Sequence, residues 1–209
     1  MKNYLVEFIG TFFLVFVIGL CGNPIAIGSM LMVMVYMGGH ISGAHYNPAV
    51  TLAIWLRKKI ETKDAIIYMI VQLLGSIAAA TCVYMIFGNN KRFVPTPDLS
   101  INVLKPLLIE ILFTFALASV VLNVATSKKT SGNQFYGLAI GFTVMSAAFA
   151  GGEISGGAYN PAVGLGPLIV DAVLGGINMA HAWLYVVGPF TGGALASIVY
   201  RIVNPDEFG

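Results

Sequence analysis

The sequence predicts an all-α integral membrane protein, with six transmembrane helices and two re-entrant half-helices arranged as a 3+3 inverted repeat. Three observations lead to this prediction. Hydrophobic residues make up 57% of the 209 residues and charged residues only 10%, whereas soluble domains carry about 25% charge. Six apolar runs approach the roughly twenty residues that a helix needs to cross a bilayer. A motif of eleven residues occurs twice.

The weak net charge excludes one class of partner. Eleven Lys and Arg stand against nine Asp and Glu, which gives a formal charge of +2. A nucleic-acid-binding surface needs a dense basic patch, and no such cluster occurs in this sequence. We therefore expect the lipid bilayer, and not a nucleic acid, to surround or contact the chain.

The apolar runs divide the chain into two similar halves. The spans are predicted at residues 5–21, 25–39, 65–87, 103–125, 135–151 and 183–203, with the second and fifth extending into their loops. Two shorter apolar segments, 47–56 and 160–170, are half a bilayer long at about 1.5 Å per residue. Residues 1–209 thus form a single membrane domain, with a first repeat at 1–87, an extracellular linker at 88–102 and a second repeat at 103–209. Three spans per half force the second repeat to be inverted.

The basic residues predict the orientation of these spans. If the chain starts in the cytoplasm, eight cations fall inside: Lys2, Arg57, Lys58, Lys59, Lys63, Lys128, Lys129 and Arg201. Only Lys91, Arg92 and Lys105 fall outside. This distribution obeys the positive-inside rule, so both termini are predicted to be cytoplasmic, in the plasma membrane.

The repeated motif places a helix start at the centre of each half. Residues 40–50 (HISGAHYNPAV) match residues 153–163 (EISGGAYNPAV) at eight of eleven positions. In the Asn-Pro pair the Asn side chain caps a helix and Pro occupies its first position. Six residues carry the pair and its following alanine: Asn47, Pro48, Ala49, Asn160, Pro161 and Ala162. Inversion then brings two positive helix ends together at the bilayer midplane.

The glycine-rich segments before these helix starts, 38–46 and 151–159, are predicted to be irregular backbone. Such backbone occurs at membrane depth only where it is buried in protein or lines a cavity. Its free carbonyls provide acceptors, and the two Asn side chains provide donors. A pathway of this kind suits small neutral polar molecules and repels cations, protons included, at its middle.

Two Asn-Pro-Ala motifs, each following Ser-Gly-x-x-Tyr, resemble the aquaporin or major intrinsic protein family over nearly the whole chain. Glu7 and Glu110 stand at the paired acidic positions of that family, and 166–167 and 188–189 are its Gly-Pro pairs. The resemblance implies a homotetramer with one pore per protomer and passive transport down the solute's own gradient. It also implies that the two acids brace the re-entrant loops, a role we favour over a proton relay.

The selectivity constriction departs from the family pattern. Val163 stands where most members have arginine, and the other constriction positions fall on Ile27, Ala148 and Gly157. None of these four is charged or aromatic. The resemblance therefore implies a wide, apolar pore for water and small uncharged solutes of the glycerol, urea, ammonia or hydrogen peroxide class, as in plant vacuolar members with the same valine. Gly164, Tyr185 and Val186 give conflicting subfamily signals.

Other residues and other functions offer alternatives to this hypothesis. His40 and His45 are candidates for pH sensing or gating at the pore mouth, although a structurally satisfied histidine is the favoured interpretation. No catalytic group, metal site or cofactor is predicted, which disfavours an intramembrane enzyme. A channel devoted to one neutral solute with poor water conductance, a structural or junctional protein with a residual pore, and a coupled transporter are the alternatives.

Overall fold

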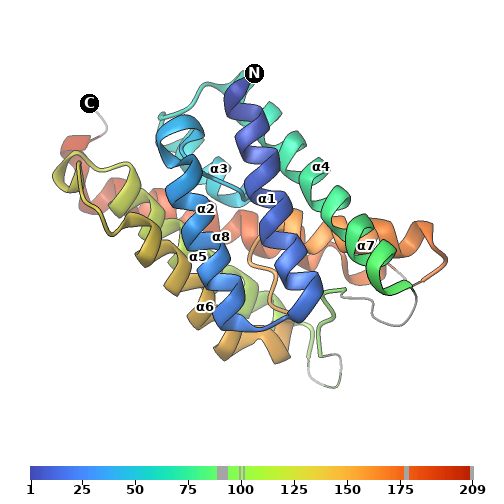
Figure 1. Cartoon of the computed structure of the whole chain (residues 1–209). Helices are drawn as coiled ribbons and strands as arrows, with labels where there is room; N and C mark the ends of the chain where they lie inside the picture. Colours follow the sequence, from blue (N-terminus) through green and yellow to red (C-terminus); the bar gives the residue numbers. More distant parts are fainter. Residues whose placement is uncertain (89–93, 99, 101, 177–178, 208–209) are drawn as a thin grey trace.

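The computed structural model describes residues 1–88, 94–98, 100, 102–176 and 179–207 (Figure 1). Its long helices run in chain order as follows: α1 Lys2–Cys21, α2 Pro24–Ser42, α3 Pro48–Leu56, α4 Thr62–Phe87, α5 Leu104–Ala125, α6 Tyr136–Ser155, α7 Pro161–Val173 and α8 Leu184–Val203. Short 3-10 turns lie at η2 Lys128–Thr130, η3 Met179–His181 and η4 Pro205–Glu207. Part of the predicted linker, including Lys91 and Arg92, lies outside the described residues.

Six of these helices are long and apolar enough to span a membrane, and α3 and α7 are the two shorter ones. The predicted fold class is confirmed, including the extension of α2 and α6 into their loops. The prediction of irregular backbone over 38–46 and 151–159 was wrong for the first part of each segment. The helices continue to Ser42 and Ser155, and Gly43 and Gly156 end them at φ +87. Helix packing here outweighs the low helix propensity of glycine.

The six spans alternate in direction, which places the two ends of the chain on one side of the molecule. We call this the terminal side; it carries the start of α1, the α3–α4 turn, the α5–α6 connection and η4. The opposite, linker side carries the α1–α2 turn and residues 94–98. The half-helices α3 and α7 start in the interior and run toward opposite sides.

Helix contacts follow the repeat. Helix α1 packs on α4 as α5 packs on α8, and α2 packs on α6 across the two repeats. Glycines allow the closest approaches: a Cβ on Gly75 would lie 2.5 Å from the backbone oxygen of Phe8, and Gly192 meets the oxygen of Ile111 in the same way. Small residues at such crossings are typical of helix packing in bilayers.

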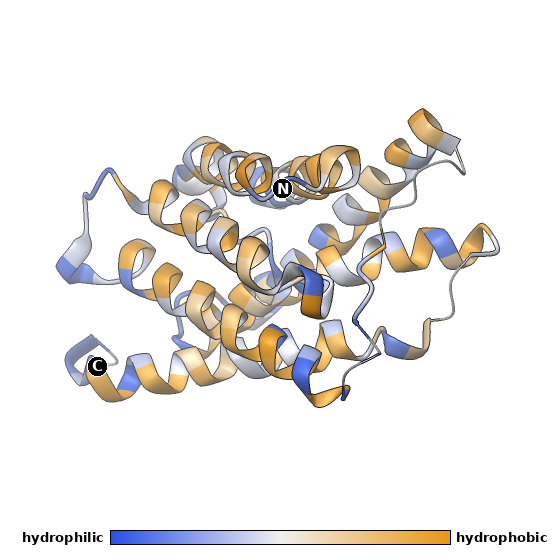
Figure 2. Cartoon of the chain, turned by 90° about the horizontal axis from the view of Figure 1, so that it is seen from below, coloured by the Kyte–Doolittle hydropathy of each residue, from blue (hydrophilic) through white to orange (hydrophobic). Residues whose placement is uncertain are grey.

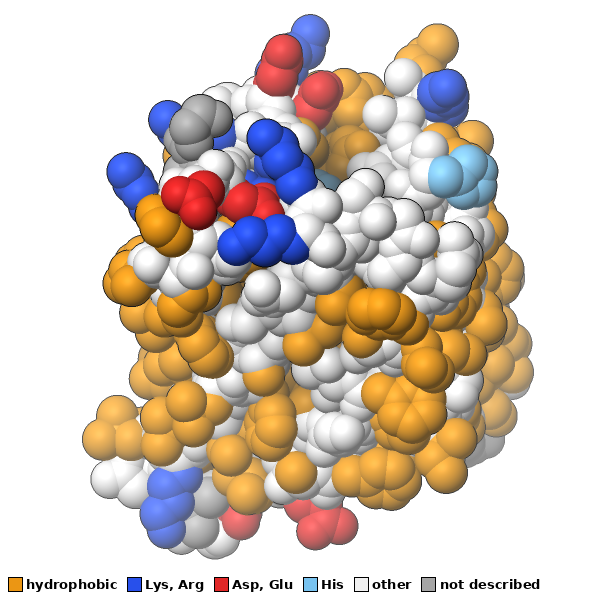
Figure 3. Space-filling model, turned by 90° about the vertical axis from the view of Figure 1, so that its left-hand side faces the viewer, with side chains coloured by type: hydrophobic (Ala, Val, Ile, Leu, Met, Phe, Trp, Pro, Cys, Tyr) orange, Lys and Arg blue, Asp and Glu red, His pale blue; other side chains and the backbone are white. Residues whose placement is uncertain are grey.

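The exterior is that of a membrane protein. Figure 2 shows hydrophobic residues along most of the helices, with strongly hydrophilic residues concentrated at helix ends and connections. In Figure 3 a broad hydrophobic band covers the visible face, with most Lys, Arg, Asp and Glu side chains above it, on the terminal side, and a smaller charged group at its lower edge. The protein is an integral membrane protein.

Candidate functional site: a pore between the two repeats

A cavity of about 400 Å³ enters from the linker side and is lined by both repeats. The four predicted constriction residues all line it: Ile27, Ala148, Gly157 and Val163. Asn47 and Asn160 line it as well, so the cavity contains both helix starts. Most of the remaining lining is aliphatic, with Glu153 at the linker side as its carboxylate.

Each half-helix starts with an asparagine N-cap that is followed by a proline. The Asn47 Oδ1 accepts a hydrogen bond from the backbone N–H of Ala49 at 2.8 Å, and the Asn160 Oδ1 accepts one from Ala162 at 2.9 Å. Proline occupies the first helical position in both. The side-chain oxygen therefore satisfies a helix N–H that would otherwise lack a partner.

The amide nitrogens of the two asparagines tie the repeats together. Asn47 Nδ2 donates to the carbonyl of Tyr159 at 2.9 Å, and Asn160 Nδ2 donates to the carbonyl of Tyr46 at 2.8 Å. An amide group carries two N–H donors, so each asparagine keeps one for a molecule in the cavity. This exchange fixes the two helix starts face to face.

Glu7 is fully buried and holds the first loop through four hydrogen bonds. Its carboxylate accepts from the Ser42 hydroxyl at 2.7 Å and from the backbone N–H groups of His45 and Tyr46 at 2.9 and 2.7 Å. The fourth donor is the Gln72 side chain, at 2.8 Å. Two of these four donors are backbone groups of the re-entrant loop and a third, Ser42, is the last residue of the preceding helix α2, so the carboxylate fixes the path of the loop.

Glu110 occupies the equivalent place in the second repeat and is also fully buried. It accepts from the Ser155 hydroxyl at 2.7 Å and from the backbone N–H groups of Ala158 and Tyr159 at 3.0 and 2.6 Å. The carboxylate oxygens of both acids thus accept hydrogen bonds from the loops and from the serines that precede them. Bound oxygens of this kind are poorly placed to pass protons along, which agrees with a bracing role.

The loops share an unusual backbone that leaves carbonyls open. Residues 43, 44 and 46 have positive φ, as do residues 156, 157 and 159. Among the described residues, none donates a hydrogen bond to the carbonyls of residues 43–45 and 156–158, whereas the flanking carbonyls of Tyr46 and Tyr159 accept from the asparagines. Five of these six residues line the main cavity. The first loop therefore brings two of these residues to the main cavity and the second loop three, as candidate carbonyl acceptors for a passing solute.

Sequence reasoning missed the pair that supports this backbone, Tyr46 and Tyr159. Their hydroxyls donate to the carbonyls of Met34 and Ala147 at 3.0 and 2.9 Å, which anchors each loop to the preceding helix. Tyr46 fills the space over Gly38, where no Cβ fits. The identity of the two tyrosines in the repeat was visible in the sequence, but their partners were not.

A chain of polar side chains reaches the cavity in the first repeat. The Thr51 hydroxyl donates to the Asn47 carbonyl at 3.0 Å and accepts from the Gln72 Nε2 at 3.1 Å. With the hydroxyl proton given to the Asn47 carbonyl, this arrangement favours the tautomer in which the His45 Nδ1, 3.1 Å away, is the donor in their contact. The His45 Nε2 is then an acceptor, and it lies beside Gly43, which has no side chain to cover it.

A second cavity, of about 530 Å³, opens on the terminal side, and His45 lines both cavities. Because it lines both, His45 lies at the junction between them, with only 7% of the residue exposed. His40 is exposed in the last turn of α2 and is not among the described residues that line either cavity. The structure thus separates the two histidines that the sequence suggested for the mouth.

The chain also matches a family model. The model described as "Major intrinsic protein" matches residues 1–200. The chain belongs to the major intrinsic protein family. Within the curated proteins, it is 35% identical to the glycerol uptake facilitator protein-like 6 of Lactiplantibacillus plantarum, over 99% of this chain and 100% of that protein. It is 37% identical to aquaporin TIP2-3 of Arabidopsis thaliana, over 96% of this chain and 86% of that protein.

A solved structure supports the same fold. The aquaglyceroporin from Plasmodium falciparum superposes with a TM-score of 0.87, covering 99% of this chain and 98% of that one, at 22% identity. Members of the major intrinsic protein family are passive channels and not enzymes. The protein is accordingly a transmembrane channel for water and small solutes, and the two cavities with His45 between them are the candidate pore.

Proposed function

We propose that this member of the major intrinsic protein family conducts water together with small uncharged solutes of the glycerol, urea, ammonia or hydrogen peroxide class, and excludes ions and protons. The observation that supports this breadth is the set of four predicted constriction residues, Ile27, Ala148, Gly157 and Val163, which line one cavity and are all uncharged. An apolar ring without arginine admits larger neutral molecules than a charged one.

Exclusion of cations follows from the centre of the pathway. The N-termini of α3 and α7 meet there, and each helix start carries a partial positive charge. A cation must also give up its hydration shell to enter, and burying an unpaired charge is costly. Neutral molecules exchange water hydrogen bonds for the free asparagine N–H groups and the loop carbonyls.

Reconstituted vesicles test this proposal directly. After an osmotic step with sucrose, light scattering should report faster water efflux than in empty vesicles; steps with glycerol and urea should then report solute entry. A pH-sensitive dye inside the vesicles should show no added proton leak. Fast water flow without solute entry would contradict the broad selectivity, and a proton leak would contradict the exclusion mechanism.

Val163→Arg tests the constriction itself. The added guanidinium should reduce glycerol and urea entry at least tenfold while part of the water flow remains. Val163→Leu is the matched control, because it adds volume without charge. If the leucine variant blocks solutes as strongly as the arginine variant, size alone sets the selectivity.

The arrangement of the chain in the membrane is also a proposal. We propose that the terminal side is cytoplasmic, because the eight cations predicted inside lie on it, whereas Lys105 is the described cation on the linker side. We further propose a homotetramer in the plasma membrane, built from protomers with repeats at 1–87 and 103–209 and the linker at 88–102. Native mass spectrometry and protease access in sealed vesicles test the assembly and the orientation.

A further inference from the structure

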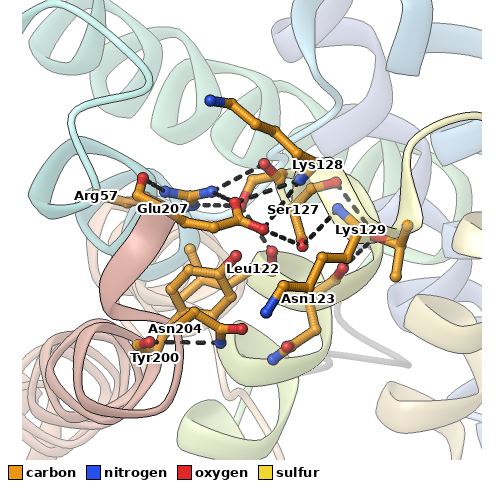
Figure 4. A network of polar contacts seen from close by, with 11 residues as sticks. Arg57, Leu122, Asn123, Ser127, Lys128, Lys129, Tyr200, Asn204 and Glu207 are labelled. Carbon is orange, nitrogen blue, oxygen red and sulfur yellow. Dashed lines mark hydrogen bonds and ion pairs between the residues drawn. The ribbon is translucent and has the colours of Figure 1, made fainter. Parts of the chain in front are cut away.

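Outside the pore, one buried cation joins three separate segments on the terminal side. Arg57 follows the last residue of half-helix α3, and its side chain is 0% exposed. A buried guanidinium must find acceptors for its donors, because leaving it unpaired is strongly unfavourable. Figure 4 shows where these acceptors come from.

The first partner is the connection between α5 and α6. Arg57 Nε donates to the Thr126 hydroxyl at 2.7 Å, and its Nη2 donates to the Thr126 carbonyl at 3.0 Å. The guanidinium also lies over the ring of Tyr200 in α8, 4.6 Å from its centre. Half-helix α3 is thereby tied to α5 and α8 at the end remote from Asn47.

The second partner is Glu207, in the η4 turn that follows α8. Its carboxylate forms an ion pair with Arg57, and its backbone carbonyl accepts from Arg57 Nη1 at 3.0 Å. The other carboxylate oxygen accepts from the Ser127 hydroxyl at 2.5 Å and from the Lys128 backbone N–H at 3.1 Å. With 4% of its side chain exposed, Glu207 closes the cluster from the terminal side.

This cluster is linked to the pore in two ways, one direct and one through helix α3. Thr126 lines the second cavity, together with His45. Arg57 is the C-cap of α3, whose N-cap is Asn47, so a shift at Arg57 is transmitted along a helix of only nine residues. The half-helix is therefore fixed at its start by Glu7 and Tyr159 and at its end by the Arg57 cluster.

The second repeat has no equivalent of this cation. Aligning Asn47 with Asn160 places Val170 where the first repeat has Arg57, and valine carries no donor. The cluster is thus an addition to the symmetric core and is specific to the terminal side.

We propose that Arg57 and Glu207 are positioning residues, and that together they hold half-helix α3 and the terminal-side mouth of the pore in the conducting arrangement. The segment after α8 thereby controls the pore through one carboxylate. This inference rests on the proposed channel function for its permeability readout, but its structural part can be tested separately.

The experiment uses the full chain in liposomes with Glu207→Ala, and Asp206→Ala as the matched control. Asp206 is the adjacent acid and is exposed, so its removal changes the charge equally without touching Arg57. We expect Glu207→Ala to speed amide hydrogen exchange at least tenfold in residues 53–59 and 126–131, and to lower water permeability per folded channel at least threefold. Sodium formate on both sides of the membrane should restore part of both, by supplying a carboxylate to Arg57.

The outcomes separate the two proposals. Unchanged permeability in a folded Glu207→Ala channel, or unchanged exchange in residues 53–59, would overturn the positioning role. If the unaltered protein conducts no better than empty vesicles, the channel proposal fails, and the exchange data alone then decide whether the cluster holds α3. Ser127→Ala, which removes one donor and leaves the ion pair, should give smaller changes in the same direction; it serves if Glu207→Ala does not fold.

Discussion

The two re-entrant loops have nearly the same backbone and very different side chains. Both follow a helix that ends in glycine at φ +87, both have a tyrosine at φ 49, and both are held by a buried glutamate. In the first repeat, His45 of the loop, Thr51 of α3 and Gln72 of α4 form a polar chain from Glu7 to the cavity. With Asn47 aligned to Asn160, the positions of His45 and Thr51 carry Ala158 and Gly164 in the second repeat, which have no polar side chain.

The two repeats of this pore therefore share one backbone conformation in their loops while their side chains differ in chemistry. The backbone must be the same in both repeats because it orients the asparagines and the carbonyls. The side chains are free to differ, so the terminal-side half is polar and tightly held while the linker-side half is small and apolar. In the second repeat, Tyr185 fills the space beside α7 that a larger residue at position 164 would need. A Cβ on Gly164 would overlap Tyr185.

The largest expected effect comes from the two buried acids. Glu7→Gln should destabilise the protein more than Glu110→Gln, because Glu7 accepts four hydrogen bonds and Glu110 three. Each buried donor left unpaired costs about 1–3 kcal/mol. Thermal unfolding in detergent measures the difference, with the exposed Glu153→Gln as the control. Equal losses in both variants would show that Gln72 adds nothing to the first loop.

The next effect concerns the space filled by the tyrosines. Gly38→Ala should cost about 1–3 kcal/mol of stability through overpacking, and Gly151→Ala less. The reason is that the Tyr46 hydroxyl lies closer to Gly38 than the Tyr159 hydroxyl lies to Gly151. A Cβ on Gly151 would be 2.7 Å from the Tyr159 hydroxyl. Gly152→Ala, with no heavy atom within 4 Å of its Cβ, should leave the melting temperature unchanged. A drop for Gly152→Ala as large as for Gly38→Ala would refute the packing explanation.

A smaller effect should distinguish the polar half of the pore from the apolar half. His45→Leu keeps the size of the side chain but removes the Nε2 acceptor, so water and glycerol permeability should fall about twofold to tenfold, the value of one hydrogen bond. Leu31→Ile, a change in an apolar residue of the same cavity, is the control. Permeability that stays constant in His45→Leu would mean that solutes do not use this acceptor.

The smallest expected effect is the loss of stability when Glu207 in the Arg57 cluster is protonated, because this protonation begins only well below neutral pH. The hydroxyl of Ser127, the Lys128 N–H, Tyr200 and the charge of Arg57 together lower the pKa of Glu207 from 4.5 to about 2, against the opposing effect of burial. A carboxylate with a lowered pKa stabilises the fold fully above its unfolded value and loses this contribution as the pH falls toward its folded value. Stability from the cluster should therefore be constant above pH 4.5 and decline between pH 4.5 and 2.

Hydrogen exchange of residues 126–131 as a function of pH, corrected for the intrinsic rate, measures this decline. Glu207→Ala should remove the pH dependence, whereas Asp206→Ala should keep it. A transition centred near neutral pH would show that another group controls the α5–α6 connection.

The sequence predicted the elements well because each depends on neighbouring residues. The six spans follow from runs of apolar side chains, and both half-helices start where an asparagine precedes a proline. The helix ends were less accurate: the segments 38–42 and 151–155 are helical although glycine-rich, because Tyr46 and Tyr159 pack against them. That packing involves residues from the following loop and was not visible from helix propensity.

For the candidate pore, the sequence named the residues but not their connections. It identified Asn47 and Asn160 from the repeat, yet it did not indicate that their amides bind each other's loops, 112 and 114 positions away. It suggested His45 as a mouth residue without its tautomer, which depends on Thr51 and Gln72. It gave Arg57 no role beyond the charge count, since its partner Glu207 is 150 positions away.

What the sequence by itself determined are the hydrophobic spans, the two capped helix starts and the twofold repeat, because hydropathy and capping act between residues within a few positions of one another. The tertiary structure alone decided how the asparagines pair across the repeats, which nitrogen of His45 contacts Thr51 and how Arg57 is neutralised. These depend on which distant groups the folded helices bring within hydrogen-bond distance in a buried site, where every donor must find an acceptor.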